Sequence, residues 1–242
     1  MFRLFGRKII LLGLICLVGL VGSQKSMAQQ NLSFYDVQKF NFGFLIGFTA
    51  NDLQISKQID SYTSDSLLGV SSVTNTGIKL GIISNLKISN NIDLRLTLPT
   101  LAFTDRTLSY TFADPSLNQD VKLESAYVEF PVAFKFKTNR MRNVRVYFIA
   151  GAKYGYDVLF NRRNDPENPT QGEIPVKLSA NNFEISYGFG VDFYYEYFRF
   201  SPEIRISNGM SNLLIPIDPP NEYHSPLNQL LARTVTLTFH FE

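Results

Sequence analysis

The chain has 242 residues, of which 45% are hydrophobic, 14% aromatic and 18% charged, and it contains no Trp. This composition excludes an intrinsically disordered chain, which would be poor in apolar residues and rich in charge. The formal net charge is only +2 and no run of Lys or Arg occurs beyond the N-terminus, so nucleic acid is not expected as a partner.

The N-terminus has the features of a cleavable signal peptide. Three basic residues lie within the first eight, an apolar stretch covers residues 9–21, and Ser26-Met27-Ala28 forms a small-x-small cleavage site. The apolar stretch is shorter than the roughly 20 residues that a spanning helix needs. The only cysteine, Cys16, would leave with this peptide, so an exported mature chain could form no disulfide bond.

From residue 40 onward, apolar residues alternate with small or polar residues in a period of two. Phe40, Phe42 and Phe44, for example, alternate with Asn41 and Gly43. This pattern predicts strands that have one apolar and one polar face. It recurs in eight segments, at residues 40–49, 77–82, 92–98, 126–136, 144–153, 183–193, 198–206 and 234–241.

The links between these segments alternate in length. Short links lie near residues 89–91, 138–143 and 196–197, whereas long links cover residues 51–73, 113–120, 160–181 and 209–230. Outer-membrane barrels have this asymmetry, with tight periplasmic turns and longer external loops, and an even strand number places both termini in the periplasm. We predict an all-β fold, an eight-stranded antiparallel transmembrane β-barrel with a side-chain-filled lumen. The expected organisation is a signal peptide (1–28), a periplasmic N-terminal segment (29–39) and the barrel (40–242).

A period of two is also compatible with a soluble, lipocalin-like periplasmic carrier whose apolar face points inward. The polar faces favour the membrane barrel because their Gly, Ser, Thr and mixed charges suit the narrow interior of eight strands. The apolar faces extend over the 9 to 11 positions that a tilted spanning strand requires, and their aromatic rings would overfill such a lumen. We therefore predict a lipid-facing wall that includes Phe44, Ile46, Leu80, Leu96, Phe134, Phe148, Phe189, Ile204 and Leu237.

Charged residues on the apolar face are expected only near a rim of the barrel, where their cost is small. Lys122 and Glu124 would open the fourth strand and Arg233 the eighth, all at the external end. Three prolines interrupt predicted strands, and because proline cannot donate to a ladder, we expect bulges or local bends at Pro99, Pro131 and Pro202.

Charges of both signs lie on the polar faces of several strands. Buried charges must be paired, so they predict a network of salt bridges and hydrogen bonds that plugs the lumen. An ion-selective pore is the alternative, but one sign would then dominate and more strands would be needed. The predicted lumen charges are Lys79, Asp93, Arg95, Glu129, Lys135, Arg145, Lys153, Asp157, Glu184, Asp192, Arg199, Glu203 and Arg205.

No pattern indicates a metal site, a cofactor site or a small-molecule substrate. The two histidines, His224 and His240, have no zinc-site spacing, and the acidic stretch 161–173 lacks the regular carboxylate spacing of a calcium loop. Glu222, His224 and Ser225 could form a hydrolytic triad at the lipid surface. However, the adjacent His224 and Ser225 would point to opposite faces of an extended strand, so we expect no catalytic residue.

Several stretches of the predicted barrel resemble those of a known family. They are KFNFGF at 39–44 with Gly47, GIISNL at 81–86, LRL at 94–96, LPTLAF at 98–103, RTLSY at 106–110, EFP at 129–131, GAKY at 151–154, YEYFRFSPE at 195–203 and NLL at 212–214. Together they resemble the PorT (SprT) family of outer-membrane barrels of the type IX secretion and gliding apparatus. RTLSY and YEYFRFSPE are the most particular to that family.

The resemblance implies a non-enzymatic outer-membrane barrel that is required for export of proteins bearing a type IX sorting signal. Its implied partners are outer-membrane lipid and other subunits of the secretion system, including a very large translocon barrel. Two alternatives remain open, a small barrel enzyme that modifies lipid and an outer-membrane barrel unrelated to secretion.

Overall fold

The computed structural model describes residues 31–57, 67–160, 178–216 and 227–242. The predicted signal peptide therefore lies outside the described residues. Among the described residues, no helix combines the length and the hydropathy required to cross a bilayer. The elements are η1 (Ser33–Asp36), β1 (Phe40–Lys57), β2 (Leu67–Val73), β3 (Asn75–Lys87), β4 (Ile92–Phe103), β5 (Arg106–Phe112), η3 (Pro115–Leu117), β6 (Gln119–Leu123), β7 (Ala126–Lys137), β8 (Val144–Asp157), β9 (Asn181–Tyr194), β10 (Arg199–Gly209) and β11 (Leu227–Phe241).

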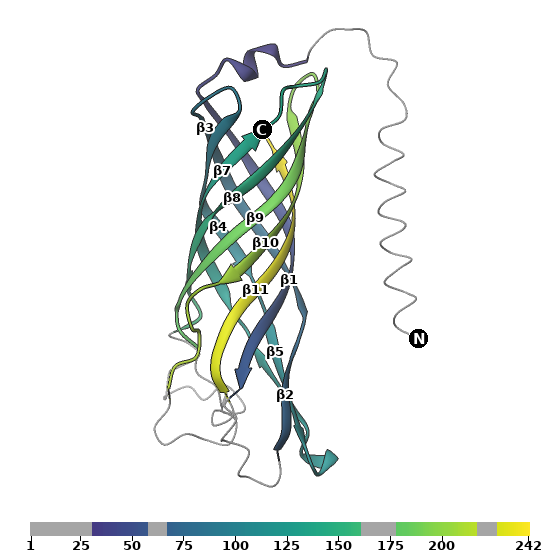
Figure 1. The fold of residues 1–242 in the computed structure, drawn as a ribbon, viewed down its shortest axis with the longest axis vertical. Coiled ribbons are helices and arrows are strands. Elements are labelled where there is room, and N and C mark those ends of the chain that lie inside the picture. The colour runs from purple at the N-terminus through teal and green to yellow at the C-terminus, as the bar shows by residue number, and fades with distance from the viewer. Residues whose placement is uncertain (1–30, 58–66, 161–177, 217–226) are drawn as a thin grey trace, which may run out of the picture. The chain divides into compact units, whose positions relative to one another are not determined.

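Eight strands form a closed antiparallel barrel in the order β1-β11-β10-β9-β8-β7-β4-β3 (Figure 1). Each pairs with its neighbours along the barrel, and β1 pairs with both β3 and β11, which closes the sheet without a free edge. All eight predicted strands correspond to barrel strands, so the predicted fold class is confirmed. We call the end that carries η1, the short turns and Glu242 the turn end, and the opposite end the loop end.

A separate three-stranded sheet, β2-β5-β6, lies at the loop end. The alternation of apolar residues did not predict this sheet. The expected long link over residues 51–73 was wrong for residues 51–57, which extend β1, and for residues 67–73, which form β2. The link expected over residues 209–230 was likewise wrong at its end, because β11 begins at Leu227.

An apolar cluster explains why these segments are ordered as strands. The buried residues of β5 and β6 pack against the loop-end parts of β1 and β11. These short strands face no lipid, but their apolar side chains are buried in this cluster. The cluster comprises Leu53, Val70, Leu108, Tyr110, Phe112, Val121, Leu123, Leu178, Leu213, Leu214, Leu227, Leu230 and Ala232.

The positions expected for the rim charges need correction. Lys122 lies in β6 and not at the start of a barrel strand, and Glu124 lies between β6 and β7. Arg233 lies within β11, opposite Asp52 of β1. On the outer face of β1, the apolar positions end at Ala50, so Asp52 marks the loop-end limit of the apolar wall on this strand.

Two of the three prolines lie at one bulge. Between Leu96 and Thr100 of β4, three residues lie opposite two residues of β7, one of which is Pro131. The bulge changes which positions face outward, from Leu96 before it to Leu101 after it. The prediction is confirmed for Pro99, whose strand carries the extra residue, whereas Pro131 lies opposite this bulge in a strand that keeps its register with β8. At Pro202, the pairing with β9 is interrupted without a change of register, so the strand has no bulge there.

Glycines provide room for large side chains inside the narrow barrel. Tyr147 of β8 lies opposite Gly190 of β9, and a Cβ atom at residue 190 would lie 2.3 Å from the Tyr147 hydroxyl oxygen. Tyr147 is held there because its hydroxyl donates to Glu203 and the Lys135 ammonium lies over its ring.

Replacing Gly190 by Ala is therefore expected to displace Tyr147 and to lower the free energy of unfolding by about 1–3 kcal/mol. Gly69→Ala is the matched control, because no atom lies within 4 Å of its Cβ position. Unfolding by urea in lipid vesicles, followed by circular dichroism, measures both variants. Equal stability of the two variants would contradict this packing account.

Candidate functional site

The lumen is lined by every second residue of the barrel strands, and the thirteen predicted lumen charges all lie on these inward positions. Alternation along each strand directs them inward, while barrel closure brings strands that are distant in sequence to within contact. The structure adds inward residues that were not predicted to take part: Asn85, Lys137, Tyr147, Asn182 and Glu242.

Toward the loop end, two lysines and two glutamates form a balanced cluster. Lys79 and Lys153 lie 2.6 and 2.7 Å from the two carboxylate oxygens of Glu129. Lys153 also lies 2.9 Å from Glu184, which accepts a hydrogen bond from Asn182. Each lysine therefore has a carboxylate partner from another strand, so the cluster ties β3, β7, β8 and β9 together.

In the middle of the lumen, Glu203 is the shared acceptor. Arg95 lies 2.9 Å from one of its carboxylate oxygens, to which Tyr147 also donates at 2.9 Å. Arg205 binds the other oxygen at 2.6 Å. Arg95 and Glu203 are 108 residues apart in the sequence, and their contact joins β4 to β10 across the interior.

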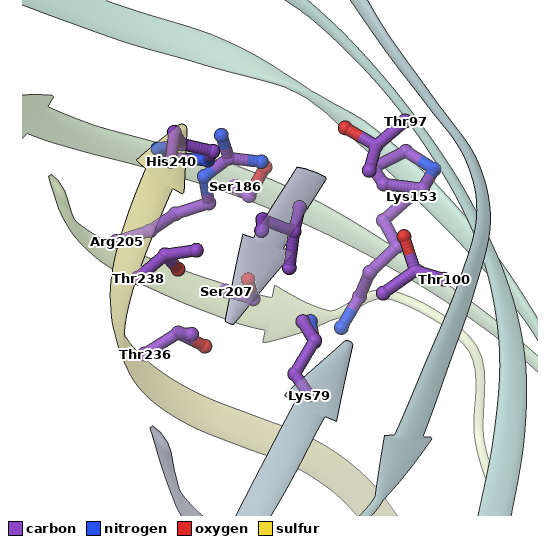
Figure 2. A pocket seen from close by; sticks show the side chains of 12 residues that line it. Lys79, Thr97, Thr100, Lys153, Ser186, Arg205, Ser207, Thr236, Thr238 and His240 are labelled. Atoms are coloured by element: carbon purple, nitrogen blue, oxygen red, sulfur yellow. The ribbon is translucent and has the colours of Figure 1, made fainter. Parts of the chain in front are cut away.

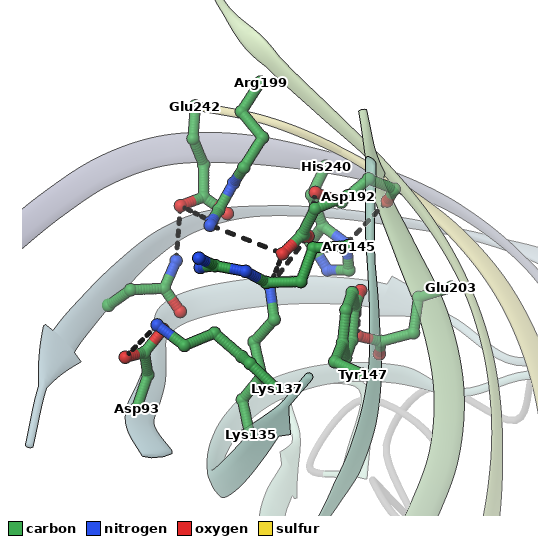
Figure 3. A network of polar contacts seen from close by, with 12 residues as sticks. Asp93, Lys135, Lys137, Arg145, Tyr147, Asp192, Arg199, Glu203, His240 and Glu242 are labelled. Atoms are coloured by element: carbon green, nitrogen blue, oxygen red, sulfur yellow. Dashed lines mark hydrogen bonds and ion pairs between the residues drawn. The ribbon is translucent and has the colours of Figure 1, made fainter. Parts of the chain in front are cut away.

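A third group lies toward the turn end (Figure 3). Both oxygens of Asp192 lie 2.8 Å from the Lys135 ammonium, and Ser201 donates to the same carboxylate. Arg199 pairs with Glu242 and lies 3.7 Å from Asp192. Separately, Lys137 pairs with Asp93 at 2.6 Å.

Little space remains between these groups. A cavity of about 20 Å³ lies between the middle and loop-end clusters, and it has room for about one water molecule (Figure 2). It is lined by charged and hydroxyl side chains, including Lys79, Lys153, Arg205, Thr100 and Thr238. Paired charged side chains therefore occupy much of the described interior around this cavity.

The N-terminal segment crosses the turn end of the barrel. We call residues 31–36, which include η1, the strap. Asp36 lies 3.2 Å from Arg140 and 3.0 Å from Arg145, while the Tyr35 hydroxyl donates to Glu242 at 2.5 Å. Lys87 donates to the Asp36 carbonyl oxygen. These contacts link the strap to β3, β8 and the chain end beyond β11, so it closes the predicted periplasmic mouth.

Aromatic and cationic side chains support the strap. The Arg199 guanidinium lies 4.3 Å from the centre of the Tyr35 ring, and Arg140 lies 3.8 Å from the centre of the Tyr194 ring. Burial raises the pKa of the Tyr35 phenol well above its ordinary value, although the positive charge of Arg199 opposes this shift. The neutral phenol is therefore the form that the attached strap favours.

The outer wall carries the apolar side chains. Seven of the nine residues predicted to face lipid are exposed, and Leu96 and Phe148 are half-buried between their neighbours. Phe148, for example, packs against Phe136 and Phe189, with ring centres 6.3 and 5.2 Å apart. Phe189 remains 63% exposed, which is costly for such a ring in water and favourable in hydrocarbon.

Most of the residues considered for catalysis and calcium binding belong to segments that the structure does not describe. Glu222, His224, Ser225 and residues 161–173 lie outside the described residues. His240 is buried, and its Nδ1 lies 3.1 Å from the carbonyl oxygen of Ser201. Within the described part of the chain, no three His, Cys, Asp or Glu side chains are grouped as a metal site would require.

A closed eight-stranded barrel with a polar interior and an apolar outer wall defines the class of outer-membrane β-barrel proteins. Residues 24–214 match a family model described as an outer membrane protein beta-barrel domain, which covers most of the chain. The chain therefore belongs to this family and is a protein of the bacterial outer membrane. No curated protein matches its sequence at a significant level.

Several solved structures of small outer-membrane barrels align with most of this chain. OprG from Pseudomonas aeruginosa aligns at 10% identity and a TM-score of 0.46, over 84% of this chain and 95% of OprG. Neisserial surface protein A aligns at 10% identity and a TM-score of 0.42, over 84% and 98% of the two chains. Ail from Yersinia pestis aligns at 12% identity and a TM-score of 0.33, over 84% and 98%.

The buried ion pairs predict a strong asymmetry between single and double replacements. Lys137→Met leaves Asp93 without its partner and is expected to lower the free energy of unfolding by about 3 kcal/mol. The double variant Lys137→Met with Asp93→Leu removes both charges and is expected to recover most of this free energy. The exposed Lys122, which pairs with Asp105 and Glu124, is the control, and Lys122→Met should cost less than about 1 kcal/mol. Urea titration in vesicles distinguishes these values, and a double variant as unstable as the single one would contradict the account.

Asp36→Asn is expected to weaken the strap because it removes the charge that Arg140 and Arg145 share. Hydrogen bonds to charged groups contribute about 1.5–3 kcal/mol, so cleavage of the strap by added protease should accelerate at least tenfold. Val37→Ser is the control because this side chain is 75% exposed. Unchanged cleavage of Asp36→Asn would show that these ion pairs do not hold the strap.

Alkaline pH is expected to release the strap as well. Because the folded-state pKa of Tyr35 is raised, its contribution is fully present below the unfolded pKa of about 10 and is lost as the pH rises through the folded value. Protease cleavage of the strap should therefore increase above pH 10 in the native chain. Tyr35→Phe should lack this increase, and an identical pH profile for both chains would exclude Tyr35 as the titrating group.

Proposed function

We propose that this chain is a non-enzymatic assembly or accessory component of the type IX protein secretion system in the outer membrane. The sequence stretches that resemble the PorT family support the proposal. The two most particular stretches lie at different ends of the barrel. RTLSY lies in β5 of the loop-end sheet and exposes no side chain, whereas residues 195–198 of YEYFRFSPE form an exposed turn between β9 and β10. This turn is therefore the candidate contact surface for other secretion subunits.

The packed lumen is the observation that carries this proposal. Paired charges fill the interior, and the strap covers its turn end, so conduction of a substrate through this barrel would require disruption of many buried ion pairs. A role that depends on outer surfaces is compatible with such an interior, because the β9–β10 turn and the wall are exposed. The wall contacts membrane lipid, and the large translocon barrel is the proposed protein partner.

An exposed turn offers a specific docking element. Tyr197 lies between β9 and β10 and is 88% exposed, and Tyr195 stacks on Phe198 with ring centres 5.1 Å apart. Such residues anchor many barrels at the membrane interface, and the same exposure would serve a contact with a partner subunit.

Deletion of the gene is expected to abolish the release of cargo that bears a type IX sorting signal, and a plasmid copy should restore it. Retention of a soluble periplasmic enzyme by the deletion strain is the control for general leakage. Affinity purification of the tagged chain in mild detergent should recover other secretion subunits. Normal export of sorting-signal cargo in the deletion strain would refute the proposal.

A further inference from the structure

One buried cation lacks the partner that every comparable group in this barrel has. Seven Lys and Arg residues of the described chain are buried, and six of them lie within 4 Å of a carboxylate. Arg106, which is 1% exposed, is the exception, since no ion pair joins it to any described residue. Its Nε and Nη1 also have no hydrogen-bond partner among the described residues.

Arg106 lies where the barrel meets the loop-end sheet. It begins β5, opposite Leu123 of β6, and its guanidinium lies 5.7 Å from the centre of the Tyr127 ring. Along β7, Tyr127 is the next inward residue beyond Glu129, which is already bound by two lysines. Beyond Arg106, Leu108 belongs to the apolar cluster. The guanidinium is therefore placed between the loop-end ion cluster and an apolar core.

Two further unpartnered groups lie on neighbouring inward positions. Thr104 precedes Arg106 by two residues, and its backbone N–H donates to the carbonyl oxygen of Ser125, two residues before Tyr127. The Thr104 hydroxyl and the Tyr127 hydroxyl are buried and have no hydrogen-bond partner among the described residues. Buried polar groups are nearly always hydrogen-bonded, so three unpartnered groups in one region indicate a missing acceptor.

The chemistry of this group selects the ligand. A guanidinium only donates hydrogen bonds, and its planar arrangement of N–H groups matches the oxygens of a carboxylate or a phosphate. Both hydroxyl groups can donate as well. A water molecule would supply acceptor lone pairs but would leave the buried positive charge uncompensated, whereas an oxyanion would supply both.

We propose that Arg106, together with the hydroxyls of Thr104 and Tyr127, forms a binding site for a small oxyanion, either a carboxylate or a phosphate. The site lies beneath the loop-end sheet and on the predicted external side of the lumen ion pairs. It is independent of the secretion role proposed above, because it rests only on the burial and the missing partners of these three side chains.

Thermal unfolding of the full chain, purified in detergent, tests the site. Sodium phosphate and sodium acetate are each compared with sodium chloride at equal ionic strength and pH. We expect phosphate or acetate to raise the unfolding midpoint of the native chain by several degrees in a saturable manner, as selective binding to the folded state requires. Arg106→Met should abolish this rise, and in chloride alone it should be at least as stable as the native chain.

Arg233→Met is the matched control, because Arg233 is an exposed arginine on the outer face of β11, and it should keep the full rise. A general salting effect of phosphate would appear equally in all three chains and would refute the site. If neither phosphate nor acetate raises the unfolding midpoint of the native chain specifically, the site is refuted as well, and water would be the partner of these polar groups. If Arg106→Met does not fold, Arg106→Lys provides the same comparison, and a rise as large as that of the native chain would contradict recognition by the guanidinium.

Discussion

Charge pairing in a space that excludes water is the constraint on which this barrel depends. Eight strands enclose an interior too narrow for a hydrated channel, yet their inward faces carry many charges. These charges are tolerable because they are paired, in several cases with a residue of another strand, as Arg95 and Glu203 illustrate across the lumen. The pairs therefore specify the register of the strands as well as filling the interior, and the apolar side chains are left to face the membrane.

This arrangement restricts where the protein can act. The interior is occupied, and the strap ties Tyr35 and Asp36 to the turn end of the barrel. At the other end, the apolar cluster joins the barrel to the β2-β5-β6 sheet, which extends the fold beyond the wall. Interactions with other proteins would thus involve the wall, the β9–β10 turn or the loop-end sheet.

The sequence predicted the barrel because the alternation of apolar and polar residues is a local pattern within each strand. It could not predict which charged side chains pair, because only closure of the barrel brings those residues together. The inward position of Glu129 followed from its strand, but its contacts with Lys79 and Lys153 depend on the stagger of three strands. The loop-end sheet was missed because its short strands cover an apolar cluster and not lipid. A signal for the bulge was present, since the apolar positions change parity at Pro99, between Leu98 and Leu101.

The orientation of the two faces can be measured directly by electron paramagnetic resonance, because the only cysteine, Cys16, lies in the predicted signal peptide. Spin labels at Phe44→Cys, Phe134→Cys and Phe189→Cys would be placed on the wall, and one at Thr236→Cys in the lumen. The account predicts that the wall labels collide with dissolved oxygen and not with a water-soluble nickel chelate, while the lumen label is shielded from both. Wall labels that contact the chelate, or that are shielded from both reagents, would contradict it.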